Sequence, residues 1–172
     1  MENFPLCPQI RAFVLDMDGV LTDGTVITFA QEDPVRVMQI KDGYALQLAV
    51  RCGYKVAIIS GGKSEGARKR LEGLGIEHIY MSTRDKLPVL KTFLQEAGLT
   101  PEEVLYMGDD MPDIPVMEYV GLSAAPADAA EDVLKIAQWI SPLGGGKGAV
   151  RQVIESVLKQ QGKWYTIEAF LW

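Results

Sequence analysis

The sequence predicts an α/β protein with a three-layer, Rossmann-like arrangement, in which helices cover both faces of a parallel sheet. Short β-rich runs alternate with segments of helical periodicity along most of the 172 residues. Right-handed strand–helix–strand units of this kind make neighbouring strands parallel. Ligands of such sheets bind beyond the carboxyl ends of the strands. The groups that follow each strand therefore indicate the function.

Five short apolar runs are predicted to form mostly buried strands, at 11–16, 54–60, 78–81, 104–108 and 121–125. Helical spacing of apolar residues predicts helices at 44–52, 63–75, 85–98 and 128–138. A further helix start is marked at Thr100, because Pro101 suits a first turn and Glu103 completes a capping box. These elements account for most of the chain.

The segment 25–40 breaks this alternation. Apolar and polar residues alternate on either side of "AQEDP", which predicts a β-hairpin between the first strand and the first helix. No internal repeat, low-complexity tract or linker is found, so residues 1–172 are expected to form one domain. Within it, 143–172 is expected to supply a loop, a helix and a tail.

Composition excludes several classes of function. Hydrophobic residues make up 48% of the chain and charged residues 23%, which is typical of a globular protein. A net charge of −6 argues against nucleic-acid binding, and no apolar run approaches the roughly 20 residues of a membrane helix. Cys7 and Cys52 form neither a metal-binding spacing nor a disulfide framework, so a cytoplasmic location is expected.

Polar groups stand directly after the first four predicted strands. In chain order they are Asp16 and Asp18, Ser60 and Gly61, Lys86, and finally Asp109, Asp110 and Asp113. Parallel strands bring such groups to one edge of the sheet. Asp16 and Asp109 lie close there only if a cation separates them, and oxygen ligands with open positions suit Mg²⁺.

These groups form a coherent set for phosphoryl transfer. Asp16 can act as a nucleophile and form an aspartyl-phosphate. Asp18 can protonate the leaving alcohol and then deprotonate the hydrolytic water. The groups available to hold the phosphoryl oxygens are Lys86, the Ser60 hydroxyl and the amides near Gly61.

Each feature taken alone has a simpler structural interpretation. A D-x-D pair is usually a turn or a solvated strand end, and Ser60 fits a helix N-cap. Lys86 fits a solvated first-turn residue, and the acidic run from Asp109 fits a helix start. An EF-hand is a poor match, because its glycine belongs at position six and Gly19 falls at position four. The joint order of the features favours a shared site.

Four features resemble the motifs of the haloacid dehalogenase (HAD) phosphatase superfamily: "DMDGVLTDG", "IISGG", Lys86 and "GDDMPD". Residues 11–151 resemble more closely the capless 3-deoxy-D-manno-octulosonate 8-phosphate (KDO-8-phosphate) phosphatases, also through "IKDGYALQLA" and "GGGKGAVRQV". The resemblance implies the HAD fold with a small β-hairpin in place of a cap domain. It also implies Mg²⁺-dependent hydrolysis of a sugar-acid phosphate in lipopolysaccharide-sugar synthesis.

The resemblance implies a role for each matched residue. Asp16 matches the nucleophile and a metal ligand, and Asp109 matches a further metal ligand. Asp18 matches the acid/base residue, which also binds the metal through its backbone carbonyl. The phosphate contacts are matched by Ser60, Gly61 and Lys86. The groups that orient the waters of the metal are matched by Asp110 and Asp113.

The short segment between Asp18 and Ser60 leaves no room for a cap domain. An open site either accepts a large substrate or borrows walls from another subunit. Capless relatives are tetramers whose hairpins line neighbouring sites, so the resemblance implies a homotetramer with shared active sites. The alternative is a hairpin that packs on its own domain, but its exposed edges favour pairing between subunits.

A sugar-acid phosphate carries a carboxylate as well as a phosphate, so cationic contacts are expected outside the motifs. The candidates, each of which also fits a solvated charge, are Lys63, Arg68, Lys147 and Arg151. "GGGKG" lacks the Walker spacing and is interpreted as a flexible loop that could close over a site. Gly62 departs from the family pattern, since many KDO-8-phosphate relatives carry arginine there.

The end of the chain, "KWYTIEAFLW", is rich in aromatic residues that are costly to leave in water. They either cover a groove on their own subunit or dock on a neighbour near its active site. The residues concerned are Trp164, Tyr165, Phe170 and Trp172.

Three other functions compete with the leading hypothesis. A nonulosonate 9-phosphate phosphatase would differ only in its substrate. A phospho-receiver domain uses similar groups, but it places its acidic pair at the first strand and its lysine after the last one. A non-catalytic assembly domain is disfavoured because Asp16 and Asp18 are both present.

Overall fold

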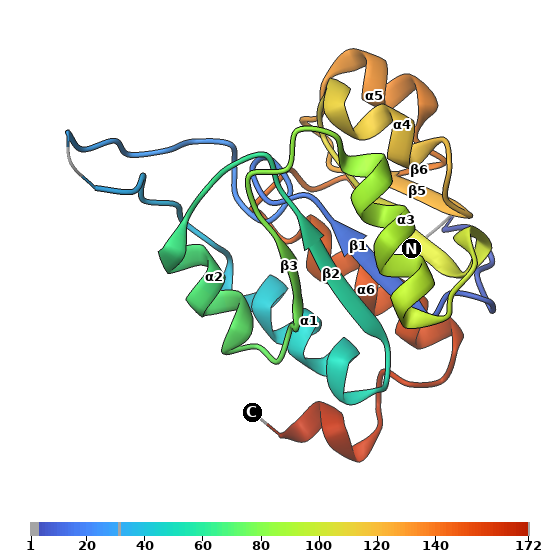
Figure 1. Ribbon diagram of the computed structural model, residues 1–172. Helices are drawn as coiled ribbons and strands as arrows, with labels where there is room; N and C mark the ends of the chain where they lie inside the picture. The colour runs from blue at the N-terminus through green and yellow to red at the C-terminus, as the bar shows by residue number, and fades with distance from the viewer. Residues whose placement is uncertain (1–3, 31, 172) are drawn as a thin grey trace.

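The computed structural model describes residues 4–30 and 32–171 and confirms the predicted α/β fold. Within these residues, six parallel strands form one sheet in the order β3-β2-β1-β4-β5-β6 (Figure 1). The strands are β1 Ala12–Leu15, β2 Lys55–Ile59, β3 His78–Tyr80, β4 Val104–Met107, β5 Leu122–Ala125 and β6 Trp139–Ile140. The α-helices are α1 Ile40–Arg51, α2 Glu65–Glu72, α3 Lys86–Ala97, α4 Ile114–Met117, α5 Glu131–Ile136 and α6 Ala149–Gln160. The 3₁₀ turns are η1 Pro101–Glu103, η2 Met111–Asp113 and η3 Ile167–Phe170.

The helices form one layer on each face of the sheet. Side chains of β1 alternate between these faces, so each face contributes apolar groups to its own core. Phe13 and Leu15 are buried in a core shared with α1, α2 and α6. Ala12 and Val14 are buried in a second core shared with α3, α4 and α5. Figure 1 shows α3 in front of the sheet and α6 behind it. All four β1 side chains are excluded from solvent, which explains why this strand lacks an apolar–polar alternation.

The five predicted strands are present, each shortened by one or two residues. Strand β6, Trp139–Ile140, was not predicted, because two residues at a sheet edge carry no periodic pattern. The marked start at Thr100 leads only to η1, although its capping box is present, since Glu103 Oε2 accepts from the Thr100 N–H at 2.9 Å. None of the helices in the described ranges has the length and apolarity needed to cross a membrane.

The predicted β-hairpin at 25–40 is reduced to one antiparallel bridge. The Ile27 and Val35 backbones exchange two hydrogen bonds, of 3.1 and 2.9 Å. We call residues 25–30 and 32–37 the arm; both segments extend away from the sheet in Figure 1. A two-stranded ribbon with little packing on the rest of its chain has only marginal pairing. In the single chain the two sides of the predicted hairpin are therefore joined by this one bridge and not by a regular ladder.

Candidate active site

A cavity of about 400 Å³ lies at the carboxyl ends of β1, β2 and β4. The parallel register aligns Leu15 with Ile58 and Met107, so the residues that follow these strands emerge at one level. The residues expected from the four motifs all line this cavity: Asp16, Asp18, Ser60, Gly61, Lys86, Asp109, Asp110 and Asp113. The structure therefore brings together the groups that the strand ends predicted.

Three carboxylates converge at the base of the cavity. One oxygen each of Asp16, Asp109 and Asp113 lies within 4.8 Å of the others. Burial, opposed by the charge of Lys86, raises the pKa of Asp16 to about 6. Burial and the neighbouring Asp16 carboxylate raise the pKa of Asp109 to about 8. Both shifts mean that these negative charges are poorly compensated by the protein alone.

The turn after β1 brings Asp109 close to this cluster. Gly19 has a φ of +92°, and a Cβ atom built there would lie 2.0 Å from Asp109 Oδ2. The backbone of the turn can approach the carboxylate only because no side chain intervenes. Asp16 and Asp109 thus offer oxygen ligands at short range, which is the donor chemistry that Mg²⁺ requires. The residues present fit a magnesium ion.

Asp113 is engaged by the protein itself. Its Oδ1 accepts from Lys86 Nζ at 2.6 Å and from the Tyr106 hydroxyl. Its Oδ2 accepts from the backbone N–H groups of Asp109 and Asp110, at 3.0 and 3.3 Å. Asp113 therefore holds the loop after β4 and the lysine, while Asp16 and Asp109 keep more of their oxygen lone pairs available.

Lys86 is a buried ammonium at the first position of α3. Its Nζ lies 2.8 Å from Asp16 Oδ1 and 2.6 Å from Asp113 Oδ1. Burial acts to lower its pKa, but the charges of Asp16 and Asp113 outweigh burial, and the pKa is raised. The side chain is therefore a fixed positive charge next to Asp16, and not the solvated first-turn residue of the simpler interpretation.

The loop after β2 presents a hydroxyl and backbone amides to the cavity. Ser60 is buried, and its Oγ accepts from the Gly62 N–H at 3.1 Å, so its own proton remains available for donation. The Thr83 N–H donates to the Ser60 carbonyl at 2.9 Å, which ties this loop to the one after β3. An anion in the cavity would meet preorganised donors here.

Asp18 is held by a residue that the sequence interpretation missed. Arg36 Nε and Nη2 donate to Asp18 Oδ1 and Oδ2 at 2.7 and 3.0 Å. The two residues are 18 positions apart and Arg36 lies in the arm, where nothing in the local pattern marks it. The hydrogen bonds that Arg36 donates to Asp18, together with the charge of that carboxylate, raise the pKa of Arg36 against the opposing effect of burial.

The four cationic candidates do not line the cavity in the single chain; their described contacts lie elsewhere. Arg68 donates to the Ile79 carbonyl at 3.1 Å, and Lys147 pairs with Asp23 at 3.1 Å. Arg151 stacks on Trp164 and pairs with Glu155. Lys63 contributes its backbone carbonyl to Arg36.

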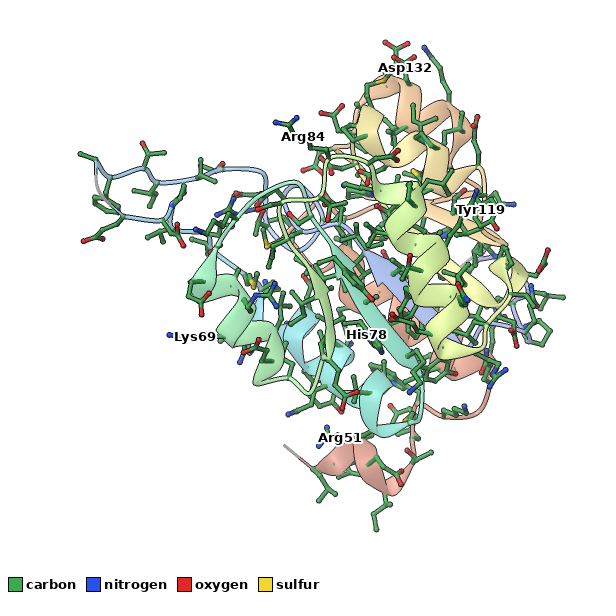
Figure 2. The ribbon with its side chains drawn as sticks, viewed as in Figure 1. Arg51, Lys69, His78, Arg84, Tyr119 and Asp132 are labelled. Carbon is green, nitrogen blue, oxygen red and sulfur yellow. The ribbon has the colours of Figure 1, made fainter. Side chains whose placement is uncertain are left out.

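Arg84 is a further residue that sequence reasoning missed. It lines the cavity from the loop before α3, and its side chain is exposed (Figure 2). Among the described residues, no ion pair or hydrogen bond of its guanidinium is seen. The sequence signal that could have identified Arg84 as a site residue is its position two residues before Lys86.

The "GGGKG" loop is packed and not free to close over a site. A Cβ atom at Gly145 would lie 1.9 Å from the Gly19 carbonyl oxygen, and one at Gly146 would lie 2.7 Å from the Thr22 carbonyl carbon. The Gly146 N–H donates to the Val20 carbonyl at 3.0 Å. The glycines let this loop support the turn that carries Gly19, so the interpretation as a flexible lid is replaced by one as a rigid support.

The aromatic residues of the tail do not all behave alike: one covers a groove on its own subunit, and others are exposed. Trp164 is 8% exposed and packs on Arg151 and Tyr44 of its own subunit. Tyr165 and Phe170 are 80% and 75% exposed, so they cover no groove of this chain. Trp172 lies outside the described residues. Trp164 therefore covers its own subunit, whereas Tyr165 and Phe170 project into solvent on either side of Ala169, whose carbonyl accepts from the Tyr44 hydroxyl.

Comparison with known proteins finds similarity over most of the chain. A family model described as haloacid dehalogenase-like hydrolase matches residues 75–154. The 3-deoxy-D-manno-octulosonate 8-phosphate phosphatase of Escherichia coli (strain K12) is 40% identical over 155 residues, which cover 90% of this chain and 82% of that protein.

Solved structures agree with this similarity. The 3-deoxy-D-manno-octulosonate 8-phosphate phosphatase from Yersinia pestis superposes with a TM-score of 0.89 at 37% identity, over 91% of this chain and 85% of that one. The enzyme of that name from Moraxella catarrhalis, solved in complex with a magnesium ion, a phosphate ion and a KDO molecule, gives 0.89 at 32% identity, over 96% and 93%.

Proposed function

The chain belongs to the 3-deoxy-D-manno-octulosonate 8-phosphate phosphatase family of haloacid dehalogenase-like hydrolases, and on this premise we propose that it hydrolyses that phosphomonoester. The products are the free sugar acid and inorganic phosphate. The observation that supports this most directly is Asp16, held 2.8 Å from the buried ammonium of Lys86 inside the cavity at the sheet edge.

In the proposed reaction, an oxygen of Asp16 forms a bond to phosphorus while the bond from phosphorus to the sugar oxygen breaks. Asp18 gives a proton to that oxygen, and the sugar leaves as an alcohol. Asp18 then takes a proton from a water molecule that attacks phosphorus. This attack breaks the bond of the aspartyl-phosphate, releases phosphate and restores Asp16.

Charge stabilisation comes from the residues around Asp16. We assign Lys86, the Ser60 hydroxyl and the amide near Gly61 to the phosphoryl oxygens, because all three line the cavity. Asp113 keeps Lys86 in place, and Asp110 caps η2 through the Met111 N–H at 2.8 Å. Held this way, the donors need little rearrangement as the phosphoryl group is transferred.

Mg²⁺ is the proposed cofactor, in agreement with the ion in the Moraxella catarrhalis structure. The carboxylates of Asp16 and Asp109, together with the backbone carbonyl of Asp18, would hold it. When bound, it neutralises phosphate oxygens that would otherwise be repelled by the carboxylates. The raised pKa values of Asp16 and Asp109 support this, because a bound cation would compensate the negative charges that burial leaves unsolvated.

A sugar acid also needs a cationic contact for its carboxylate. We assign Arg84 to this contact, because this exposed residue lines the cavity and its guanidinium is unpaired among the described residues. The similarity to octulosonate phosphatases favours the eight-carbon acid over the nonulosonate alternative, and it disfavours the receiver and the assembly domain.

Phosphate release across a panel of substrates tests this function. The wild type is expected to give its highest kcat/KM with the eight-carbon sugar-acid phosphate, a lower value with the nine-carbon acid, and the lowest with neutral sugar phosphates. Arg84→Gln should lower kcat/KM for the acids about tenfold or more and leave the neutral sugars nearly unchanged. Equal kcat/KM for acidic and neutral sugars in the wild type would contradict the substrate assignment.

We further propose that the chain forms one domain and that it assembles as a homotetramer whose subunits share active sites. We also propose that the protein is located in the cytoplasm. The arm supports assembly, since Val37, Phe29 and Ile27 are 69%, 54% and 53% exposed. Its unpaired backbone edges favour pairing with a second copy. The location is supported by Cys7 and Cys52, which are both unpaired.

Light scattering coupled to chromatography tests the assembly. The wild type should elute with the mass of a tetramer, and Ile27→Asp should lower both the mass and the activity, because it adds a charge to the proposed contact. Thr28→Asp adds the same charge at the adjacent exposed position and should have a smaller effect. A fully active monomer would argue against shared sites.

A further inference from the structure

Asp18 and Arg36 form a two-point ion pair at the mouth of the active-site cavity. The Nε–Oδ1 and Nη2–Oδ2 distances are 2.7 and 3.0 Å, which is the fork geometry of a guanidinium and a carboxylate. The Arg36 side chain is only 7% exposed, whereas that of Asp18 is 31% exposed. The arginine therefore lies behind the carboxylate, and one side of the carboxylate remains open to the cavity.

Arg36 is itself held in one position by the backbone. Its Nη1 donates to the carbonyls of Pro34 and Lys63, each at 3.3 Å. These two carbonyls belong to the arm and to the loop after β2, so both segments fix the guanidinium. A side chain held from two directions loses little further entropy when it orients a partner.

The space for this ion pair depends on Gly62. A Cβ atom built at Gly62 would lie 2.8 Å from Arg36 Nη2 and 2.8 Å from Asp18 Oδ2. Any side chain there would displace the guanidinium, the carboxylate or both. The backbone of Gly62 does not adopt positive φ, so the absence of a side chain serves the contact and not a turn.

We propose that Arg36 is a positioning residue for Asp18 during phosphoryl transfer to Asp16. When the P–O bond to the leaving group breaks, the proton on Asp18 moves to the leaving oxygen, and Asp18 becomes a carboxylate. Arg36 holds that carboxylate by two charge-assisted hydrogen bonds and keeps it directed at the leaving oxygen. This role rests on the proposed function, because it takes Asp18 as the acid.

The proposal predicts a dependence on the leaving group. An alkyl phosphate needs a proton on its departing oxygen, whereas p-nitrophenolate departs readily without one. Since kcat/KM covers the steps up to the departure of the alcohol, it includes this proton transfer and excludes the later hydrolysis of the aspartyl-phosphate. In Arg36→Gln, kcat/KM for sugar and other alkyl phosphates should fall on the order of 10²-fold, and that for p-nitrophenyl phosphate no more than about threefold.

Two further variants separate positioning from a structural role. Gly62→Ala retains the charge of Arg36 but crowds the pair, and it should show the same selective loss on alkyl esters. Arg36→Lys should recover part of the alkyl activity, because it restores a cation without the fork. Arg11→Gln makes the same chemical change at an exposed arginine paired with Glu103, and it should leave both substrates unaffected.

The outcomes distinguish the positioning role of Arg36 from the phosphatase function on which that role rests. Equal losses of kcat/KM on alkyl and p-nitrophenyl esters in Arg36→Gln would overturn the positioning role and leave the phosphatase function intact. A wild type that hydrolyses simple esters but does not prefer the sugar acid would overturn only the substrate assignment. A wild type that hydrolyses no phosphate ester would overturn the proposed function, and the positioning role with it.

Discussion

Replacement of Asp16 by asparagine is expected to abolish turnover, with kcat lowered by a factor on the order of 10⁴ or more. The asparagine amide has nearly the same shape, but it cannot form the aspartyl-phosphate through which the reaction proceeds. The fold should persist, because Lys86 keeps its ion pair with Asp113 at 2.6 Å when the Asp16 charge is removed. The thermal midpoint should therefore stay within a few degrees of the wild-type value.

Phosphate release and circular dichroism measure the two parts of this expectation. Mass spectrometry of acid-quenched enzyme should show a phosphate adduct on the Asp16 peptide of the wild type and none on that of Asp16→Asn. Asp132→Asn makes the same change at an exposed position of α5 and should retain full activity. Undiminished turnover in Asp16→Asn would exclude Asp16 as the nucleophile.

Removal of divalent metal is expected to abolish activity and to make stability fall as the pH rises. Burial raises the pKa of Asp109 to about 8, so the folded protein binds a proton there that the unfolded chain releases near pH 4. A raised carboxyl pKa stabilises the folded state at low pH, and this contribution is lost as the pH rises towards the folded-state value. Asp16, with a pKa of about 6, acts in the same direction.

Thermal melts of EDTA-treated protein between about pH 5 and pH 8 test this expectation. The melting temperature should fall as the pH rises, and Mg²⁺ should restore activity and raise the melting temperature more at the upper pH than at the lower. Asp109→Asn should flatten the pH dependence of the metal-free protein and weaken its response to Mg²⁺. Full turnover of metal-free protein would show that the carboxylates serve another purpose.

The elements at the centre of the sheet could be predicted because their signals are local. Strands β1 and β4 are short apolar runs, β2 is apolar after Lys55, and each is followed within two residues by a polar residue that lines the cavity. Alternation of strands and helices then places these residues at one edge, as in any parallel sheet. The positions of Asp16, Ser60, Lys86 and Asp109 along the chain were sufficient to predict that they meet.

The arm and β6 could not be predicted in the same way. The alternation at 25–40 is real, but a regular ladder needs a surface to pack on, and the single chain leaves Ile27 and Val37 exposed. Strand β6 has two residues, and its pairing with β5 is determined by the sheet edge it joins. In both cases the partner, and not the local sequence, decides the structure.

The contacts of the cationic side chains could not be predicted from the local sequence either. Lys63, Arg68, Lys147 and Arg151 were chosen by charge and by proximity to motifs, yet in the single chain none of the four lines the cavity. Arg151 lies over the ring of Trp164, 4.4 Å from its centroid. The direction of a long flexible side chain depends on the packing around it, and no spacing rule reports that.

The sequence by itself determined the chemistry of this protein: which carboxylates, hydroxyl and ammonium follow which strands, and therefore which reaction they can perform. Only the tertiary structure decided how these groups are held. Asp113 is engaged by Lys86 and Tyr106, the glycine loop supports the turn at Gly19, and Arg36 meets Asp18 over a gap left by Gly62. The physical reason is that motifs record short-range order along the chain. Orientation comes from contacts between distant segments, which form only when the chain is folded.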